Sequence, residues 1–335
     1  MGKIGKSSIE FDETPYIRGA ACIAGQKEGD GPIGSQIDKI IQETEAKAKS
    51  WEEAESLLQQ NVLELLLDKT GMKVKELRYI FAGDLLGQII ATSFAVEQFR
   101  IPLFGLYGAC STMGEAMSLA AMTVSAGYAE DVVAMTSSHF ASAEKQFRFP
   151  LDYGNQRPLS ATWTVTGAGG VIISTTKSDV KITGITTGRI IDYGVTDSMN
   201  MGAVMAPAAS DLIHQNLLDF EVGPDYYDAI YTGDLGYVGQ TILIDLLQDR
   251  GIDIKSNHHD CGIEIYDREK QDTHSGGSGC GCSAVTLCAH ILKRISDGTY
   301  KRVLFVPTGA LLSPTSYNEG KSVPGIAHGI ILERS

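Results

Sequence analysis

The stretch GACSTMGEAMSLAAMTVSAGYAEDVVAMTSS, residues 108–138, aligns without gaps on GCGCSAVTLCAHILKRISDGTYKRVLFVPTG, residues 279–309. Each copy predicts a helix that ends at a glycine, then a polar turn and a short apolar strand. The two glycines, Gly127 and Gly298, occupy equivalent positions and are typical of helix C-termini. Apolar strands of this kind are buried in parallel sheets, so the repeat predicts a chain made of two similar units.

A second pair of segments repeats the same duplication earlier in each unit. YIFAGDLLGQ at residues 79–88 is similar to AIYTGDLGYVGQ at residues 229–240, and each predicts an apolar strand that ends in Gly-Asp-Leu. Helical patterns stand beside both strands, and alternating β and α elements predict sheets covered by helices. We therefore expect an α/β fold of two pseudo-repeated βα halves, residues 1–177 and residues 178–335.

Two segments of the first half interrupt this pattern. Residues 27–60 are rich in charged side chains and predict a helical insertion near the surface. Residues 140–163 are rich in proline, arginine and aromatic residues, and we expect a long irregular loop there. Long ordered loops often cover a site, and a surface or dimer loop is the alternative.

The composition excludes several classes of protein. The chain has 28 basic and 41 acidic residues and a net charge of −13, so we expect no nucleic-acid partner. The six cysteines lack the paired spacing of zinc sites and predict reduced thiols in a cytosolic compartment. Adjacent His258 and His259 point to opposite faces of a strand, so we expect no metal site. The apolar segment 106–128 contains many small and polar residues and predicts a buried helix, not a transmembrane segment.

Cys110 stands where a turn of small residues becomes a helix, in YGACSTMGEA at residues 107–116. Backbone N–H groups and the helix dipole at such a position stabilise a thiolate and lower the pKa of the thiol. The same donors can form an oxyanion hole for an acyl carbonyl. Cys110 is therefore the candidate nucleophile if the protein is an enzyme.

A second helix start, in HSGGSGCGCSA at residues 274–284, predicts donors aimed at the same cavity, and two helix N-termini favour an anionic ligand. In the loop, Arg148 and Arg157 can bind ligand carboxylates or form surface ion pairs. The aspartates that end the two strands can bind calcium together with the ligand, or can be caps held by N–H groups of their own turns. The candidate ligand-binding residues are Asp84, Cys110, Arg148, Asp234, Gly277 and Ser278.

The duplicated α/β pattern, with a cysteine at the start of a buried helix, resembles the thiolase superfamily of thiolases and ketoacyl synthases. TVTGAGGVIIS at residues 164–174 and VPTGALLS at residues 306–313 are similar to glycine-rich segments of that superfamily. The resemblance covers nearly the whole chain outside residues 27–60. It implies a thiolase-like fold with αβαβα layers and a homodimer.

The resemblance also implies two catalytic partners for the cysteine, usually two histidines or a histidine and an asparagine. The first position falls on Asp234 or a neighbour, and the second falls on Ser278 or Gly277. A carboxylate beside the thiol disfavours the thiolate and repels a developing oxyanion. His139 and His274 are the candidate replacements, although a lone histidine is more often structural. We therefore expect a catalytically impaired scaffold.

Six segments carry a closer resemblance, to the stage V sporulation protein AD family of endospore-forming bacteria: GDLLGQIIATSF, YGACSTMGE, FRFPLDYGNQRP, TWTVTGAGG, TGDLGYVGQ and HSGGSGCGCSA. It implies a protein that binds dipicolinic acid (pyridine-2,6-dicarboxylate), with or without calcium, and supports its uptake into the developing spore. It also implies other spore membrane transport subunits as partners, and a place at the cytoplasmic face of the spore inner membrane reached through them. The alternatives are an acyltransferase or condensing enzyme that uses Cys110, and a structural subunit of a spore membrane complex.

Overall fold

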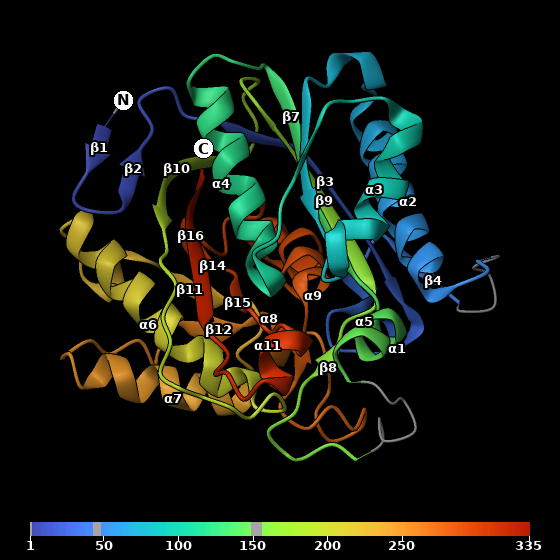
Figure 1. The fold of residues 1–335 in the computed structure, drawn as a ribbon. Coiled ribbons are helices and arrows are strands. Elements are labelled where there is room, and N and C mark those ends of the chain that lie inside the picture. The colour runs from blue at the N-terminus through green and yellow to red at the C-terminus, as the bar shows by residue number, and fades with distance from the viewer. Residues whose placement is uncertain (1, 43–47, 149–155) are drawn as a thin grey trace.

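The main strands follow one continuous path of hydrogen-bonded neighbours, and its two halves, called here the first and the second sheet, have the same strand order (Figure 1). The computed structural model describes residues 2–42, 48–148 and 156–335. The first sheet has the order β6–β5–β7–β9–β3, formed by Leu103–Gly105, Tyr79–Gly83, Asp131–Ser138, Gly167–Ser174 and Tyr16–Gly25. The second sheet has the order β12–β11–β14–β16–β10, formed by His258–Asp260, Ala229–Thr232, Arg302–Val306, Gly325–Arg334 and Val180–Thr187.

The directions of the strands repeat together with their order. In the first sheet β5 is parallel to β6 and β7, whereas β9 is antiparallel to β7 and β3. In the second sheet β11 is parallel to β12 and β14, whereas β16 is antiparallel to β14 and β10. A single residue pair, Tyr16 with Lys181, connects β3 to β10. The repeat in the sequence is therefore a repeat of topology.

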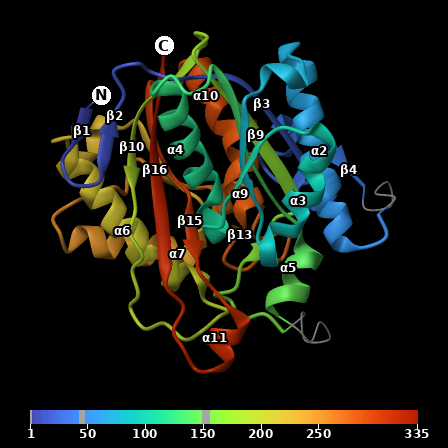
Figure 2. The ribbon, with the colours of Figure 1, turned by 45° about the horizontal axis from the view of Figure 1, so that its top comes forward.

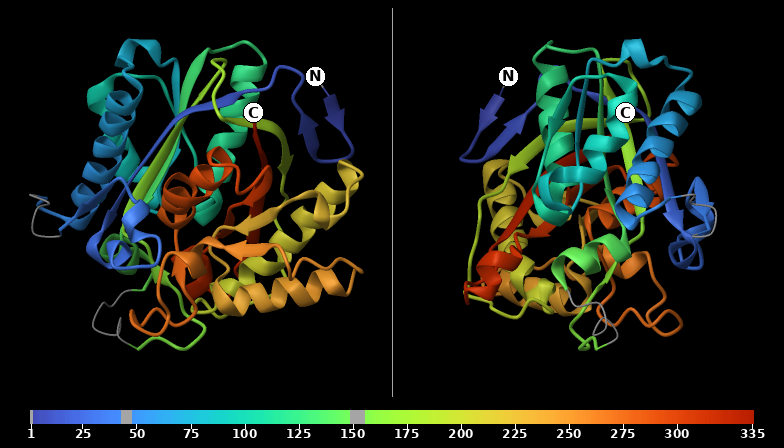
Figure 3. Two further views of the ribbon diagram at one scale, coloured as in Figure 1. Left: turned by 180° about the vertical axis from the view of Figure 1, so that it is seen from behind. Right: turned by 45° about the vertical axis from the view of Figure 1, so that its right-hand side comes forward.

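Helices form three layers around the two sheets, as the views in Figures 2 and 3 show. The outer layer of the first sheet contains α2 (Trp51–Thr70) and α3 (Ile90–Val96). The outer layer of the second sheet contains α6 (Met201–Asp219) and α7 (Gly236–Gln248). The central layer, between the sheets, contains α4 (Thr112–Ser125) and α9 (Cys280–Thr286). These layers make the αβαβα arrangement that the resemblance to the thiolase superfamily implied.

The predicted unit of helix, glycine, turn and strand is found in both halves. Helix α4 leads to β7, and α9 continues through a π-helical turn, Leu287–Ile291, and α10, Leu292–Ser296, to β14. Gly127 and Gly298 follow these helices with φ angles of 76° and 85°, which favour glycine. The prediction of a helix stop at each glycine is therefore confirmed.

Residues 43–47 lie outside the described residues, and the described parts of 27–60 do not form one helical insertion at the surface. They contain most of α1 (Gln26–Gly29), a 3-10 turn (Gly34–Gln36), β4 (Lys39–Ile41) and the first half of α2. In α2, Leu58, Leu63 and Leu66 are buried against the first sheet, so the helix is a core element equivalent to α6. The sequence pattern did not indicate the apolar face that these leucines form, because glutamates dominate the start of α2.

The segment 140–163 is also more regular than the sequence suggested. It begins with α5 (Phe140–Phe147) and ends at β8 (Trp163–Thr164), which pairs with β13 (Gly277–Ser278). Residues 149–155 of this predicted loop lie outside the described residues. The good helix formers alanine, glutamate, lysine and glutamine account for α5.

Smaller elements complete the fold. They are β1 (Gly2–Ile4), β2 (Ser8–Glu10), α8 (Cys261–Glu264), β15 (Thr308–Ala310) and α11 (Pro314–Asn318). The apolar segment 106–128 contains α4, which is buried between the sheets as predicted. Among the described residues, no helix has both the length and the apolar character needed to cross a bilayer. All six cysteines are free.

Candidate functional site

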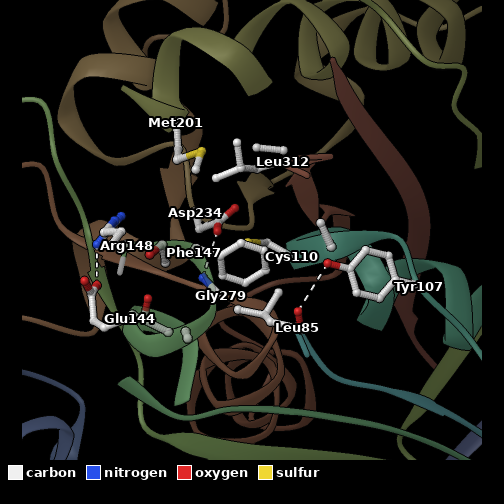
Figure 4. A pocket seen from close by; sticks show the side chains of 15 residues that line it. Leu85, Tyr107, Cys110, Glu144, Phe147, Arg148, Met201, Asp234, Gly279 and Leu312 are labelled. Atoms are coloured by element: carbon white, nitrogen blue, oxygen red, sulfur yellow. Dashed lines mark hydrogen bonds and ion pairs between the residues drawn. The ribbon is translucent and has the colours of Figure 1, made fainter. Parts of the chain in front are cut away.

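A cavity lies where the turns that precede α4 and α9 approach each other (Figure 4). Its empty space, including the mouth, is about 540 Å³. In Figure 4, Tyr107 lies on one side of it and the Glu144–Arg148 pair on the other, with Cys110 and Phe147 between them. The polar residues that line it are Tyr107, Cys110, Glu144, Arg148, Thr164, Asp234 and Ser278. Four of the six candidate ligand-binding residues therefore face one cavity.

The turn before α4 brings Cys110 to this cavity. Ala109 has a φ angle of 50°, in the left-handed region, where a residue with a Cβ atom is strained by roughly 1 kcal/mol. The strained turn persists because its hydrogen bonds fix it: Ser111 Oγ donates to the Gly108 carbonyl at 2.7 Å, and Thr112 Oγ1 donates to the Ala109 carbonyl at 2.6 Å. The result is a sharp elbow with the cysteine at its tip.

Asp234 is buried directly beside the thiol. Its Oδ2 accepts a hydrogen bond from the Gly279 N–H at 2.9 Å, and its Oδ1 accepts one from Thr308 Oγ1 at 2.8 Å. The carboxyl group also hydrogen-bonds with the Cys110 thiol. Burial raises the pKa of Asp234 to about 7, although these hydrogen bonds act in the opposite direction. Near neutral pH the cavity therefore contains a carboxyl group that exchanges a proton readily.

The same surroundings keep Cys110 in its thiol form. Burial raises the pKa of Cys110 well above its usual range, and the negative charge of Asp234 raises it further. The Gly279 N–H, at the start of α9, lowers the pKa but does not overcome these effects. A thiol in this state is a poor nucleophile, because the thiolate is the reactive form.

Asp84 and Gly277 are candidate residues that the structure places outside the cavity lining. Asp84 is fully buried and accepts hydrogen bonds from the N–H groups of Leu86 and Thr92, both at 2.8 Å, and from Thr92 Oγ1 at 2.6 Å. It is therefore a cap of its own turn, the alternative named for both aspartates. Gly277 is part of the short β13 pairing with Trp163, and its neighbour Ser278 is the residue that reaches the cavity.

The candidate histidines lie elsewhere. His139 is buried beside a second cavity, near the start of α2, and burial lowers its pKa to about 4. His274 Nδ1 hydrogen-bonds the Pro158 carbonyl at 2.8 Å, and its Nε2 lies 3.1 Å from Asp272 Oδ1. Within the described parts of the chain, the residues that line the cavity include no histidine and no asparagine.

The two loop arginines have different positions. Arg148 lines the cavity and pairs with Glu144 one helical turn earlier. Arg157 is paired with Asp272 and lies over the ring of Trp163, at 4.8 Å from its centroid, away from the lining residues. The cavity therefore contains one arginine whose charge a neighbouring glutamate balances.

The sequence did not predict several residues that shape the cavity. Tyr107 lines one wall, and its hydroxyl donates to the Leu85 carbonyl at 3.2 Å. Phe147 and Glu144 reach the cavity because α5 is a helix and projects both side chains from one face. The four-residue spacing of Glu144 and Arg148 was the signal for a helix in this segment.

The described residues contain no cluster of three or more histidine, cysteine, aspartate or glutamate side chains that could hold a metal ion. His258 and His259 have separate partners, as their opposite orientations on β12 predict. His258 Nε2 bonds Thr232 Oγ1 at 3.0 Å, and His259 Nδ1 bonds Glu264 at 2.9 Å.

Comparisons with solved structures identify the fold. The 3-oxoacyl-[acyl-carrier-protein] synthase III of Aquifex aeolicus VF5 has a TM-score of 0.56 and 12% identity, with 95% of this chain and 99% of that chain covered. The Acat5 thiolase of Ascaris suum has a TM-score of 0.57 and 12% identity, with 96% and 100% covered. At such identities the likeness shows the fold alone, which is thiolase-like.

Comparisons of sequence identify the family. The family model described as Stage V sporulation protein AD (SpoVAD) matches residues 5–333. Stage V sporulation protein AD of Bacillus subtilis (strain 168) is 43% identical over 335 residues, which is 100% of this chain and 99% of that protein. The chain therefore belongs to the stage V sporulation protein AD family, and it is a sporulation protein on a thiolase-like scaffold.

Proposed function

We propose that this protein binds pyridine-2,6-dicarboxylate in the cavity beside Cys110 and supports the uptake of that ligand into the developing spore. The observation that carries the proposal is the pairing of an elbow cysteine with a buried carboxyl group, Asp234, where an acyl-transfer enzyme needs a proton-transfer partner. Membership of a sporulation family supplies the biological setting.

The lining suits a small flat aromatic acid. Leu85, Phe147 and Leu312 give apolar surfaces against which a pyridine ring can pack. At the polar end, Arg148 can bind one carboxylate in the two-pronged manner typical of guanidinium groups. Ser278 and a protonated Asp234 are donors for the other carboxylate.

Charge decides which form of the ligand the cavity accepts. A dianion meets the carboxyl groups of Asp234 and Glu144, and only Arg148 among the described lining residues is basic. Two routes reduce the repulsion: Asp234 takes up a proton, or calcium enters as a chelate with the ligand and neutralises its charge. In the second route the ligand holds the metal, and the described residues include no cluster of metal ligands.

Acyl transfer by Cys110 is the alternative function, and the site disfavours it. The thiol is neutral, and the adjacent carboxylate repels the oxyanion that forms during acyl transfer. The elbow at Ala109 fixes the position of the Cys110 side chain. A fixed side chain is useful in a binding site as well as in an active site, so the elbow does not favour acyl transfer.

Isothermal titration calorimetry tests the proposal directly. Pyridine-2,6-dicarboxylate is titrated into the protein with and without Ca²⁺, and isophthalate serves as the matched ligand that lacks the ring nitrogen. We expect micromolar or tighter binding, weakened roughly tenfold or more by Arg148→Gln, because a charge-assisted hydrogen bond is lost. The exposed Arg189, paired with Asp211, supplies the control variant Arg189→Gln, which should bind normally. Absence of heat with ligand in both conditions would end the proposal.

Intact-mass spectrometry after incubation with acyl-CoA tests the alternative. We expect no stable adduct on the wild-type chain. An acyl adduct that disappears in Cys110→Ala would favour an acyltransferase and contradict a pure binding role.

The proposal includes a place at the cytoplasmic face of the spore inner membrane, reached through other transport subunits. Its support is family membership and the absence, in the described residues, of a helix able to cross a membrane. Fractionation of spores with and without those subunits tests it. We expect the protein in the membrane fraction only when they are present, and membrane association without them would contradict this part. The Arg148→Gln variant, which should bind the ligand only weakly, should still associate with the membrane. That result would show that attachment to the transport subunits does not depend on ligand binding.

A further inference from the structure

A buried glutamate outside the cavity hydrogen-bonds α5, the helix that forms one wall of the cavity. Glu55 belongs to α2 and is fully buried. Ser137 Oγ, at the end of β7, donates to Glu55 Oε1 at 2.9 Å, and Ser142 Oγ, in the first turn of α5, donates to Glu55 Oε2 at 2.6 Å. A single carboxyl group therefore connects α2, the end of a central strand and α5.

Helix α5 is the element that this carboxyl group can position. Ala143, Glu144 and Phe147 of α5 line the cavity, and Arg148 follows directly. Ser142 immediately precedes these residues, so a movement of the first turn of α5 changes the shape of the cavity. The contact from Glu55 to Ser142 is thus one residue removed from the cavity wall.

A continuous chain of hydrogen bonds links Glu55 to a second buried carboxyl group, Asp84. Gln59 Nε2 donates to Ser137 Oγ at 2.8 Å and to Thr92 Oγ1 at 2.9 Å, and Thr92 Oγ1 donates to Asp84 Oδ2 at 2.6 Å. Neither carboxyl group is bonded to a lysine, arginine or histidine of the described residues. Two buried carboxylates without a cation are too costly to keep ionised together.

The hydrogen bonds decide which of the two carboxyl groups keeps a proton. Asp84 accepts two backbone N–H bonds, so it is the better place for the negative charge. Glu55 contacts only hydroxyl groups, and hydroxyl groups can reverse direction. Ser142 Oγ lies 3.0 Å from the His139 carbonyl, so it can donate there while it accepts a hydrogen bond from the protonated carboxyl group of Glu55.

Other ionisable groups surround Glu55 at greater distance. Glu52, one turn earlier in α2, is paired with Lys145 of α5 at 2.6 Å. His139 precedes α5, and Cys280 is the first residue of α9, on the other side of β7. Burial and the neighbouring Asp84 raise the pKa of Glu55 to about 8, whereas the serine hydroxyls lower it.

We propose that Glu55 is a positioning residue of the cavity, which in its neutral form fastens α5 to the end of β7 through Ser142 and Ser137. The effect on ligand affinity rests on the proposed function, but the effect on α5 does not. Because the pKa of Glu55 is higher in the folded chain, its contribution is complete at acidic pH and is lost as the pH rises through about 8. Alkaline pH should therefore loosen α5 and weaken ligand binding together.

Hydrogen–deuterium exchange of the ligand-free protein tests the inference, with amide rates of residues 140–147 corrected for intrinsic pH dependence. In the wild-type chain we expect exchange about tenfold faster at pH 9 than at pH 7, since a buried hydrogen-bonded link is weakened. Glu55→Gln resembles the neutral carboxyl group and should keep slow exchange at both pH values. Glu55→Ala should exchange quickly at both.

Glu52→Gln is the matched control, because it removes the exposed ion pair between the same two helices. It should keep the wild-type pH dependence. Equal exchange of residues 140–147 in wild type, Glu55→Gln and Glu55→Ala at both pH values would overturn the inference, and so would a pH dependence that persists in Glu55→Gln. Thermal melting shows whether Glu55→Ala is folded, and the comparison of wild type with Glu55→Gln remains decisive if it is not.

Calorimetry with pyridine-2,6-dicarboxylate gives the second readout. We expect affinity in Glu55→Gln to lose the part of its pH dependence that lies near pH 8. If no variant binds the ligand, the proposed function fails while the exchange experiment still decides the role of Glu55. If the ligand binds but α5 behaves identically in all variants, the role of Glu55 fails alone.

Discussion

Replacing Asp234 by asparagine should remove the part of the pH dependence of ligand binding that is centred near pH 7, and should leave the part near pH 8 that the Glu55 inference predicts. Asp234 lines the cavity, and burial raises its pKa to about 7. An ionised Asp234 faces a dianionic ligand without a compensating cation of its own, whereas a protonated Asp234 can donate a hydrogen bond to a ligand carboxylate. Asparagine has the same shape and stays neutral at every pH.

The size of the effect follows from the titration of this one group. If only the protonated form binds, the apparent Kd is the intrinsic Kd divided by the protonated fraction. With a pKa of about 7, that fraction is about 0.9 at pH 6, about 0.5 at pH 7 and about 0.01 at pH 9. The apparent Kd of the wild-type protein should therefore rise about 100-fold between pH 6 and pH 9, which corresponds to about 2.7 kcal/mol.

Calorimetry in buffers of different ionisation enthalpy measures both the Kd and the protons taken up on binding. From Asp234 we expect about half a proton per ligand at pH 7 and about 0.9 at pH 8, and in Asp234→Asn we expect less than about 0.2 at pH 7, where Glu55 is mostly neutral. The measurement is made without Ca²⁺, so that the ligand charge is constant. A wild-type Kd that changes less than threefold between pH 6 and pH 9, with no proton uptake, would refute the reasoning.

Two further predictions concern stability and assembly. Gly279 has a φ angle of +100°, and a Cβ atom there would lie 2.6 Å from Ser138 Oγ, so Gly279→Ala should lower the free energy of unfolding by about 3 kcal/mol in urea denaturation. Its control, Gly251→Ala, has a φ angle of +75° but open space around the Cβ, and should cost about 1 kcal/mol; equal losses would show that crowding is irrelevant. Phe104, half exposed on the edge strand β6, should contribute to the expected homodimer, so Phe104→Glu should shift the mass in light scattering from dimer to monomer, whereas exposed Tyr128→Glu should not. A monomeric wild-type protein would contradict the dimer.

The fold could be predicted from the sequence because both halves carry the same local sequence signals, which are glycines that end helices and short apolar strands. Gly127 and Gly298 end equivalent helices, and the strands before Asp84 and Asp234 are short apolar runs. The helix at the start of α2 was predicted, but its burial was not, because Glu55 is a buried charged residue type and periodicity arguments assign glutamate to the surface. Only the packing of α2 against β7 and α5 shows why a glutamate is present there.

The site could be predicted only in part, because contacts distant in sequence decide it. Cys110 and Ser278 precede helices, and a repeat locates helix starts well. Tyr107, Glu144 and Phe147 reach the cavity through the placement of α5 and of the turn before α4, which no motif in the sequence specifies. Their positions follow from tertiary packing.

The two equivalent aspartates show why a motif does not fix a role. Asp84 and Asp234 both end a strand in the same Gly-Asp-Leu sequence. Asp84 accepts hydrogen bonds from its own turn and from Thr92, eight residues later. Its carboxyl group therefore stabilises the local turn. Asp234 finds its donors in Gly279 and Thr308, on two other elements that border the cavity.

The long-range donors hold the Asp234 carboxyl group against Cys110, with whose thiol it hydrogen-bonds, and this difference governs the chemistry of the site. A histidine at this position would accept the thiol proton and leave a thiolate paired with a cation. The carboxyl group instead holds the thiol neutral and itself exchanges a proton near pH 7. The protein thus has the elbow, the helix ends and the cavity on a thiolase-like scaffold, and under the proposed function the proton on Asp234 responds to the charge of the ligand.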